Sequence, residues 1–497
     1  MDVRKRSSAA VRGVVALLVT PLTIGAIGAA TGAVAHGTTG CKTFTSLESC
    51  SSNAECARGT TCDSDGHFCA NGGPIRIGVV SPVTGTLKLR GIGDEMNAAI
   101  GFAEWLFNER ELKPLGRGFE FTILDDESDA ETARRRAQTH ADADVIAIVG
   151  PLTSGQMLEA QKASYPKHIL HLGPTLGAAA LGAAQPEIGG ERFLFQLSPD
   201  VANGSPLGLV YYLRKLNEDS PATPVCKRTF VFYNDDVTGR DFNATYVDRF
   251  KANGMCVIGG APIPVETKPS YETEIAALDA VDADCVIVGV NPAPAKKIFE
   301  DIDTLIPQAE RDKYLWIGNS ATRVPGFLDI PKSEGFIGSD VDYTPIERPE
   351  YQELLSLYKE YLVARGATPA DVADVQMPSR AVPITDSLVV LALALERAGN
   401  GATPEMLRDA YLEVAQFEEG DETFSPIAFF DAIRAIRRGK KIDYSGGSSN
   451  IEFLPTGFYT GAPSQIWRVK NGAFERVRQV TEKEASTVKT AKGDGCK

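Results

Sequence analysis

The feature that most constrains the fold of this chain is an alternation of short apolar segments with stretches of helical spacing. The segments 75–80, 119–124 and 145–149 are apolar runs of strand length, and each is followed by a turn and a helical pattern. The same alternation begins again after 193–197 and continues to 314–318. Strands that alternate with helices form right-handed βαβ units around a parallel sheet. The sequence therefore predicts an α/β protein.

The length of the chain predicts more than one domain, because 497 residues exceed what one ordinary core accommodates. The alternation divides into two α/β units of similar size, with no repeat of sequence between them. Beyond the second unit the pattern becomes helical, at 350–366, 381–398 and 404–417. Strand-like pieces end the pattern, and the last two are joined by a hairpin turn at Asn471-Gly472.

The N-terminus has the pattern of an export signal. Basic residues precede an apolar run at 14–35 that is rich in alanine and glycine, as in a signal peptide. We expect either cleavage after Ala35, which makes 1–35 the signal peptide, or lipidation of Cys41 in a loose lipobox (TTGC). An uncleaved anchor is the alternative, since the run is long enough to span a membrane. The mature chain is expected in the periplasm or at the cell surface, and on the membrane only through a lipidated Cys41.

Nine cysteines in an exported chain are expected to pair mostly as disulfides. The polar segment 36–74 cannot bury a core and is predicted to be a disulfide-stapled linker or small module. Its candidate disulfide cysteines are Cys50, Cys56, Cys62 and Cys69. Zinc binding with His67 is the alternative, but the C-x-x-C pairs typical of zinc sites are missing. No metal is expected.

The remaining cysteines are scattered along the chain. Cys226 and Cys256 precede two successive predicted strands, whose starts would lie side by side, so a disulfide between them is predicted. Cys285 lies inside an apolar strand and is predicted to be a buried free thiol. Cys496 is expected to pair with Cys41 or to stay free.

Charge and motif content exclude several classes of function. The formal net charge is −14, and no basic stretch stands against this acidic background, so nucleic acid is not expected as a partner. The chain has only five histidines and lacks the H-E-x-x-H, G-x-S-x-G and P-loop motifs. We expect neither an enzyme nor a bound cofactor.

Several short motifs resemble those of one family. They are IGVVSPVTG at 77–85, LDDESD at 124–129, IVGPLTSG at 148–155, FQLSPD at 195–200, TDS at 385–387 and IEFLPTG at 451–457. In this order and spacing they resemble the type I periplasmic binding proteins of the leucine/isoleucine/valine-binding group, from 75 to 480.

The resemblance implies two Rossmann-like lobes with parallel sheets, joined by three hinge crossovers near Pro199, Asp342 and Gly447. The first lobe would comprise 75–198 and 344–447, and the second 199–343 and 448–480, before a flexible tail at 481–497. Ligand would bind in the cleft between the lobes, which close on it by a hinge motion.

The resemblance also implies ligand-binding residues on the first lobe. Ser154 matches the serine that holds the ligand carboxylate in the family, although a serine there can simply cap the following helix. Thr175 stands near the position of a family threonine, which this chain replaces with Gly177. Arg90 stands where amino-acid binders often carry an aromatic residue, and could face an acidic ligand group or simply be solvated. The neighbouring candidates are Leu152, Thr153 and Leu176.

On the second lobe the matching positions are Thr238, Asn291 and Ser320, and on the first lobe Thr385 stands where relatives often have a cleft tyrosine. Ser320 departs from the family, which places there a carboxylate for the ligand ammonium. Because an ammonium buried without an anion is costly, either another acid such as Asp236 serves or the ligand is not an α-amino acid.

The function that the resemblance implies is solute capture for transport. We expect a monomer that binds a small polar solute, an amino acid or a related carboxylate or amide, and delivers it to the membrane permease of an ABC transporter. A ligand-sensing protein that acts through a separate signalling partner is the alternative, because fold does not fix function.

Overall fold

The computed structural model describes residues 50–52, 55–56, 60–63, 68–110, 113–184, 191–330 and 333–490. The predicted signal peptide, the lipidation candidate Cys41, the alternative zinc ligand His67 and Cys496 lie outside these ranges, as does the side chain of Cys69. Within them, no helix combines the length and the apolar character needed to cross a membrane.

The first of two large sheets is parallel throughout and has the strand order β4-β3-β5-β6-β7. Its strands are β3 (Ile75–Ser81), β4 (Phe119–Asp125), β5 (Ala147–Val149), β6 (Leu170–Leu172) and β7 (Leu194–Phe195). The predicted strands 75–80 and 119–124 thus form neighbours at one edge. This sheet confirms the parallel α/β architecture expected for the first unit.

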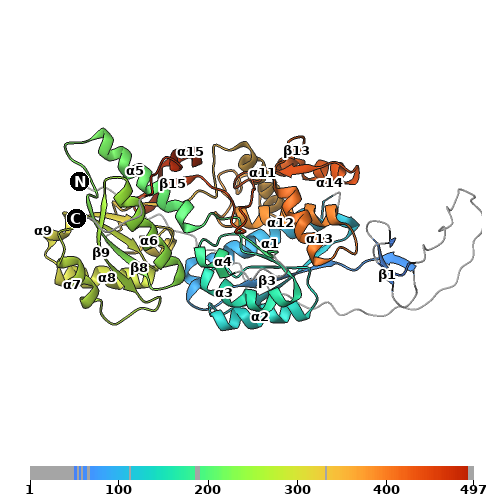
Figure 1. The fold of residues 1–497 in the computed structure, drawn as a ribbon, viewed down its shortest axis with the longest axis horizontal. Coiled ribbons are helices and arrows are strands. Elements are labelled where there is room, and N and C mark those ends of the chain that lie inside the picture. Colours follow the sequence, from blue (N-terminus) through green and yellow to red (C-terminus); the bar gives the residue numbers. More distant parts are fainter. Residues whose placement is uncertain are drawn as a thin grey trace, which may run out of the picture. The chain divides into compact units, whose positions relative to one another are not determined.

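Helices cover both faces of the first sheet (Figure 1). Ile77 and Val79 on β3 pack with α1 (Ile92–Asn108) and α12 (Ala381–Ala398), whereas Val80 packs with α2 (Ala130–Asp142) and α3 (Ser154–Ser164). Successive side chains of a strand point to opposite faces, so a continuous apolar run is what a strand covered on both sides requires.

The second sheet has the order β16-β15-β12-β11-β10-β8-β9. Its strands are β8 (Arg228–Asn234), β9 (Cys256–Ile263), β10 (Cys285–Gly289), β11 (Leu315–Gly318), β12 (Ile337–Val341), β15 (Ser464–Lys470) and β16 (Ala473–Val480). Strands β8 to β12 are parallel to one another, whereas β15 is antiparallel to β12 and β16 is antiparallel to β15. The predicted hairpin turn joins β15 to β16, with both turn residues at positive φ.

Helices also cover both faces of the second sheet. The helices α5 (Ser205–Asp219) and α6 (Val237–Ala252) pack on the face that carries Val231 and Ile287. The opposite face, with Phe230 and Val288, packs with α7 (Glu272–Asp279) and α8 (Pro292–Leu305).

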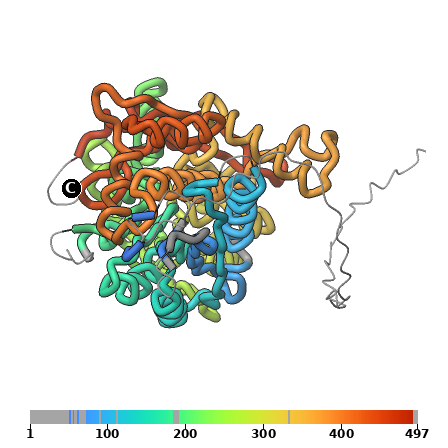
Figure 2. The backbone as a smooth tube through the Cα atoms, turned by 90° about the vertical axis from the view of Figure 1, so that its right-hand side faces the viewer, coloured from blue at the N-terminus to red at the C-terminus, as the bar shows by residue number. Residues whose placement is uncertain are grey.

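After β12 the chain returns to the first sheet and builds a helical layer there. Its helices are α11 (Pro349–Ala364), α12, α13 (Pro404–Ala415) and α14 (Phe429–Arg437). Figures 1 and 2 both show this late segment beside α1, far from it in sequence. Shorter elements complete the fold: β1 (Thr60–Asp63), β2 (Phe68–Asn71), α4 (Ala179–Ala184), α9 (Gln308–Arg311), α10 (Pro325–Leu328), β13 (Glu422–Phe424), β14 (Ile442–Tyr444) and α15 (Glu482–Ala485).

The last passage between the sheets comes later than the expected crossover at Gly447. Phe458 forms a parallel bridge with Gln196, next to β7, and Phe453 and Tyr459 lie in the core of the first sheet. The chain joins the second sheet only at β15. The family motif at 451–457 therefore leads into the first sheet. The backbone N–H of Gln196 donates to the carbonyl of Gly457, and Phe458 follows directly.

The expected flexible tail at 481–497 begins with an ordered segment. Thr481 caps α15 with a capping box, and Ala485 and Val488 are buried in the core shared with α5 and α6. These apolar side chains anchor the segment to the second sheet. Residues 491–497 lie outside the described part.

The disulfide prediction for the second unit needs a correction. Cys226 is bonded to Cys285, not to Cys256, and Cys285 is not a free thiol. Strand β8 lies between β9 and β10, so Cys226, just before β8, lies near the start of both neighbours. In the N-terminal module, Cys50 is bonded to Cys62. The sulfurs of Cys50, Cys56 and Cys62 lie within 4.8 Å of one another, but the disulfide uses two of them.

Candidate ligand cavity

A cavity of about 160 Å3 is lined by loops of both sheets. The loops follow β5, β6, β8 and β11, and two passages between the sheets, near Pro199 and Val341, complete the wall. Parallel sheets bind ligands at the carboxyl ends of their strands, and these loops leave from those ends. The volume is close to that of a protein cavity that holds one benzene ring.

The loop after β5 presents hydroxyl groups at the start of α3. Thr153 is the capping residue, since its Oγ1 accepts a hydrogen bond from the backbone N–H of Gln156 at 3.4 Å. The Thr153 hydroxyl donates to Oε1 of Gln156 at 2.7 Å. Ser154 therefore does not cap the helix: its Oγ accepts from the backbone N–H of Ala178 at 3.3 Å and donates to no residue that the structure describes.

The loop after β6 supplies a hydroxyl without a partner. Oγ1 of Thr175 is enclosed and makes no hydrogen bond to any described residue. Leu176 beside it is buried and packs with Met157 and Leu181. A buried hydroxyl that lacks a partner costs free energy, about 1–3 kcal/mol, which a ligand group could recover.

The loops of the second sheet are more acidic. Asp236 caps α6, and its Oδ1 accepts from the backbone N–H of Gly239 at 2.7 Å, with Thr238 in the same turn. After β11, Oδ1 of Asn319 accepts from the backbone N–H of Ala321 at 2.9 Å, and Ser320 lies between them. The Asn319 side chain is nearly fully buried, yet its Nδ2 donates to no described residue.

Four charged or phenolic side chains lie at the passages between the sheets. Arg380 pairs with Glu95 at 3.3 Å, and Asp340 lies 3.6 Å from Arg323. The Tyr343 hydroxyl donates to Ser198 at 2.9 Å, and burial raises the pKa of Tyr343 above its ordinary value. Burial also raises the pKa of Asp200, although backbone hydrogen bonds oppose this.

The structure brings together seven of the ten candidate residues. Leu152, Thr153, Ser154, Thr175, Leu176, Thr238 and Ser320 all line the cavity.

Of the three remaining candidates, two do not line this wall. The side chain of Arg90 lies outside the described residues. Asn291 lies behind the wall, where its backbone N–H donates to Asn234 at 3.1 Å. Thr385 is buried inside α12, because nearly every residue of that helix packs in the core and only its N-terminal end reaches the cavity.

Sequence reasoning missed the roles of Asp200, Asp340, Tyr343 and Arg380 in the wall. The first three stand beside the expected crossovers at Pro199 and Asp342, which could have drawn attention to them. Arg380 precedes the predicted helix 381–398, but nothing local indicates that it meets Glu95.

Comparison with known proteins identifies the family. The model of the periplasmic binding protein family matches residues 74–437. The chain belongs to this family. A comparison with curated proteins finds no match.

Solved structures share the fold at low sequence identity. LivK, a leucine-binding protein of Thermotoga maritima, has a TM-score of 0.61 at 16% identity, over 82% of this chain and 99% of that one. LivJ of Streptococcus pneumoniae, in complex with isoleucine, gives 0.60 at 14%, over 82% and 99%. A solute-binding protein of an ABC transporter from Rhodopseudomonas palustris, in complex with 3,4-dihydroxybenzoic acid, gives 0.59 at 16%, over 82% and 98%. The resemblance to type I periplasmic binding proteins and the fold class are thus confirmed, and the neighbours are solute-binding proteins.

Proposed function

We propose that this chain is an extracytoplasmic, non-enzymatic binding protein that captures a small polar solute and delivers it to the permease of an ABC transporter. The observation that carries this proposal is a set of polar groups that line the cavity and have no acceptor among the described residues. Oγ1 of Thr175 is enclosed without a hydrogen bond, and Ser154 Oγ and Asn319 Nδ2 donate to no described residue. An enclosed hydroxyl such as that of Thr175 costs free energy until a ligand satisfies it.

The first-sheet side of the cavity suits an anionic or carbonyl end of the ligand. Helix α3 begins at Ser154, and the exposed N–H groups of a helix start favour negative charge. Ser154 and Thr175 add hydroxyl donors beside it. A carboxylate or amide oxygen placed there would receive hydrogen bonds from groups that are otherwise unused.

The proposed mechanism is capture between two lobes, each built on one of the sheets. The lobes comprise 75–198 with 344–447, and 199–343 with 448–480, except that 448–463 follows the first sheet. Ligand bridges the loops of both sheets, a hinge motion at the three passages closes the cleft, and the closed form docks on the permease. The disulfides Cys50–Cys62 and Cys226–Cys285 suit the oxidising periplasm or cell surface.

A melting experiment on the purified full chain tests the proposal. We expect one or more small carboxylates, amides or amino acids to raise the melting temperature, because ligand binds the folded state only. Replacing Thr175 with Val removes the unpartnered hydroxyl at nearly constant volume. It should weaken binding about tenfold while leaving the ligand-free protein as stable or more so.

The matched control is Thr304→Val, at an exposed hydroxyl of α8 that donates to the Glu300 carbonyl. It should leave binding unchanged. Equal binding by the wild type and Thr175→Val would remove Thr175 from the site. A panel without any shift would contradict solute capture, and uptake of an identified ligand by cells that lack the chain would contradict delivery.

A further inference from the structure

We propose that the solute is basic, with a net positive charge, and that Asp200 and Asp236 hold its cationic nitrogen. This inference rests on the proposed function and concerns the same cavity. It follows from which charges around the cavity have partners and which do not.

Two arginines near the cavity are already matched by carboxylates. Arg380 binds Glu95 through its side chain at 3.3 Å and through its backbone N–H at 2.7 Å. Arg323 lies 3.6 Å from Asp340. These pairs leave no spare positive charge for an anionic ligand on this side of the cavity.

The remaining carboxylates outnumber their positive neighbours. Oδ1 of Asp200 accepts from the backbone and side-chain nitrogens of Asn203, at 2.9 and 3.0 Å, and the Ala202 backbone also donates to this carboxylate. Asp236 accepts from the backbone of Gly239, and Asp241 accepts from the backbone N–H of Ala179 at 2.8 Å. Arg249 acts on Asp200 and Arg240 acts on Asp236, but Arg240 is already paired with Asp235 at 2.8 Å.

The charges of Asp200 and Asp236 disfavour the ionisation of Asp241. Burial raises the pKa of Asp241, and the charges of Asp200 and Asp236 raise it further. A cation between these groups would remove that cost, since a buried carboxylate is stable only when it is paired and hydrogen-bonded. A zwitterionic ligand carries a carboxylate as well as its ammonium group, so it would leave a negative charge of these aspartates uncompensated. A basic ligand brings a net positive charge and would compensate it.

Neutral donors in the same cavity supply what the other end of such a ligand needs. On the first-sheet side, Oγ1 of Thr175 is enclosed without a hydrogen bond and Ser154 Oγ donates to no described residue. On the second-sheet side, Asn319 is 2% exposed and its Nδ2 has no acceptor among the described residues. The cavity thus combines neutral donors with acids that lack a cationic partner of their own. A solute with an acceptor group and one or two cationic nitrogens, such as a basic amino acid or a monoacylated diamine, fits this distribution.

The test compares L-lysine with L-norleucine, which has the same carbon chain without the terminal amine, by melting and calorimetry of the full chain. We expect lysine to bind at least about tenfold more tightly than norleucine, as for a charge-assisted pair. L-arginine and cadaverine extend the panel to a guanidinium and to a diamine without a carboxylate. L-leucine and benzoate serve as references because neither has a net positive charge.

Two variants assign the residues. Asp236→Asn keeps the helix cap, since Asn caps as well as Asp, and should reduce the preference for lysine over norleucine about tenfold. Asp200→Asn should do the same. Asp235→Asn is the control, because Asp235 points to Arg240 at 2.8 Å and does not line the cavity.

The outcomes separate this inference from the proposed function. Binding of leucine, norleucine or benzoate without any cationic compound would overturn the basic ligand and leave solute capture standing. A lysine preference that survives both Asp236→Asn and Asp200→Asn would overturn the residue assignment. No binding by any compound of the panel would count against both.

Discussion

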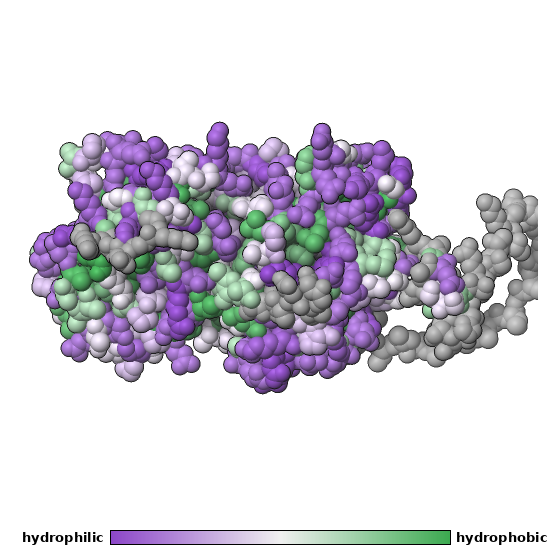
Figure 3. Space-filling model, in the orientation of Figure 1, coloured by the Kyte–Doolittle hydropathy of each residue, from purple (hydrophilic) through white to green (hydrophobic). Residues whose placement is uncertain are grey.

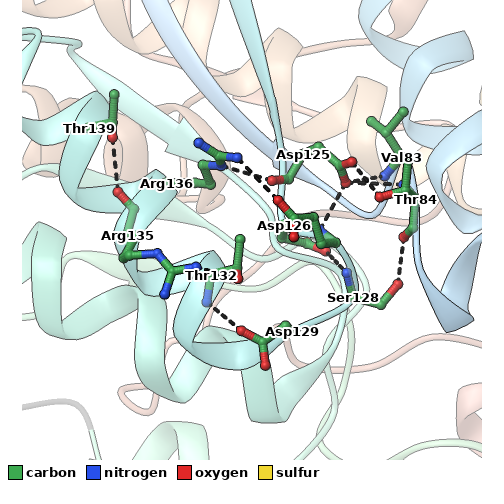
Figure 4. Close-up of polar contacts among 11 residues, drawn as sticks. Val83, Thr84, Asp125, Asp126, Ser128, Asp129, Thr132, Arg135, Arg136 and Thr139 are labelled. Carbon is green, nitrogen blue, oxygen red and sulfur yellow. Dashed lines mark hydrogen bonds and ion pairs between the residues drawn. The ribbon is translucent and has the colours of Figure 1, made fainter.

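At the scale of single residues, two adjacent aspartates at the end of β4 have opposite environments (Figure 4). Asp125 accepts hydrogen bonds from the backbone of Val83, Thr84 and Glu127 at 2.9–3.1 Å, and from the Thr84 hydroxyl at 2.6 Å. Burial opposes its ionisation, but these bonds outweigh burial and lower the pKa of Asp125. Asp126 is fully buried, its Oδ2 has no hydrogen bond to any described residue, and burial raises its pKa to about 6.

This contrast predicts opposite effects of the same substitution. Because the folded-state pKa of Asp126 lies above that of the unfolded chain, the stability it contributes falls as the pH rises from about 4 to 6. Asp126→Asn should therefore raise the free energy of unfolding by about 2 kcal/mol at pH 7 and have little effect below pH ~4. Asp125→Asn should lower it by about 1 kcal/mol at pH 7, because the amide loses acceptor capacity. Urea unfolding at several pH values measures both, and equal effects of the two substitutions would contradict the reasoning.

At the scale of elements, α12 organises the helical layer on the first sheet through one buried carboxylate. Asp386 accepts from the Tyr444 hydroxyl and the Gly447 backbone at 3.0 Å, and from the backbone and hydroxyl of Ser448 at 2.7 Å. In the motif at 385–387, the residue that makes these hydrogen bonds is thus Asp386 and not Thr385. Its carboxylate ties α12 to the loop after β14, which leads the chain toward its bridge with Gln196.

Removing this carboxylate should be costly. Asp386→Ala leaves several buried donors without an acceptor and should lower the free energy of unfolding by about 4 kcal/mol. Asp431→Ala, at an exposed pair with Arg434 on α14, is the control and should change it by less than about 0.5 kcal/mol. Denaturant unfolding of the three proteins decides this, and a small effect of Asp386→Ala would show that water replaces the carboxylate.

At the scale of the whole molecule, the two sheets are also joined beside the cavity. The carboxylate of Asp241 on α6 accepts from the backbone N–H of Ala179 at the start of α4, so one hydrogen bond links elements of different sheets. On the face drawn in Figure 3, hydrophilic side chains predominate and hydrophobic ones form separate groups.

This link predicts a local effect on opening. Asp241→Ala should speed hydrogen exchange of the Ala179 amide about tenfold in the ligand-free protein, because its acceptor is lost. It should also raise the radius of gyration measured by X-ray scattering, if the bond restrains opening. Asp248→Ala on the same helix is the control. Unchanged exchange at Ala179 would show that the carboxylate does not hold this contact.

The sequence alone determined the elements and their order, because strand and helix formation depend on local spacing of apolar side chains. The predicted helix 381–398 matches α12, the predicted strand 75–80 lies within β3, and the Asn471-Gly472 turn joins the last two strands. The hydroxyl loop at Thr153 and Ser154 was also found, since its position after a strand and before a helix is a local pattern.

Only the tertiary structure decided what depends on distant partners. Cys226 bonds to Cys285 because β8 has two neighbours, and no spacing in the sequence says which neighbour supplies the cysteine. The last passage between sheets follows the bridge of Phe458 to Gln196, and Arg380 reaches the cavity beside Glu95. These contacts join residues from 59 to 285 positions apart, and their geometry exists only once the sheets have formed.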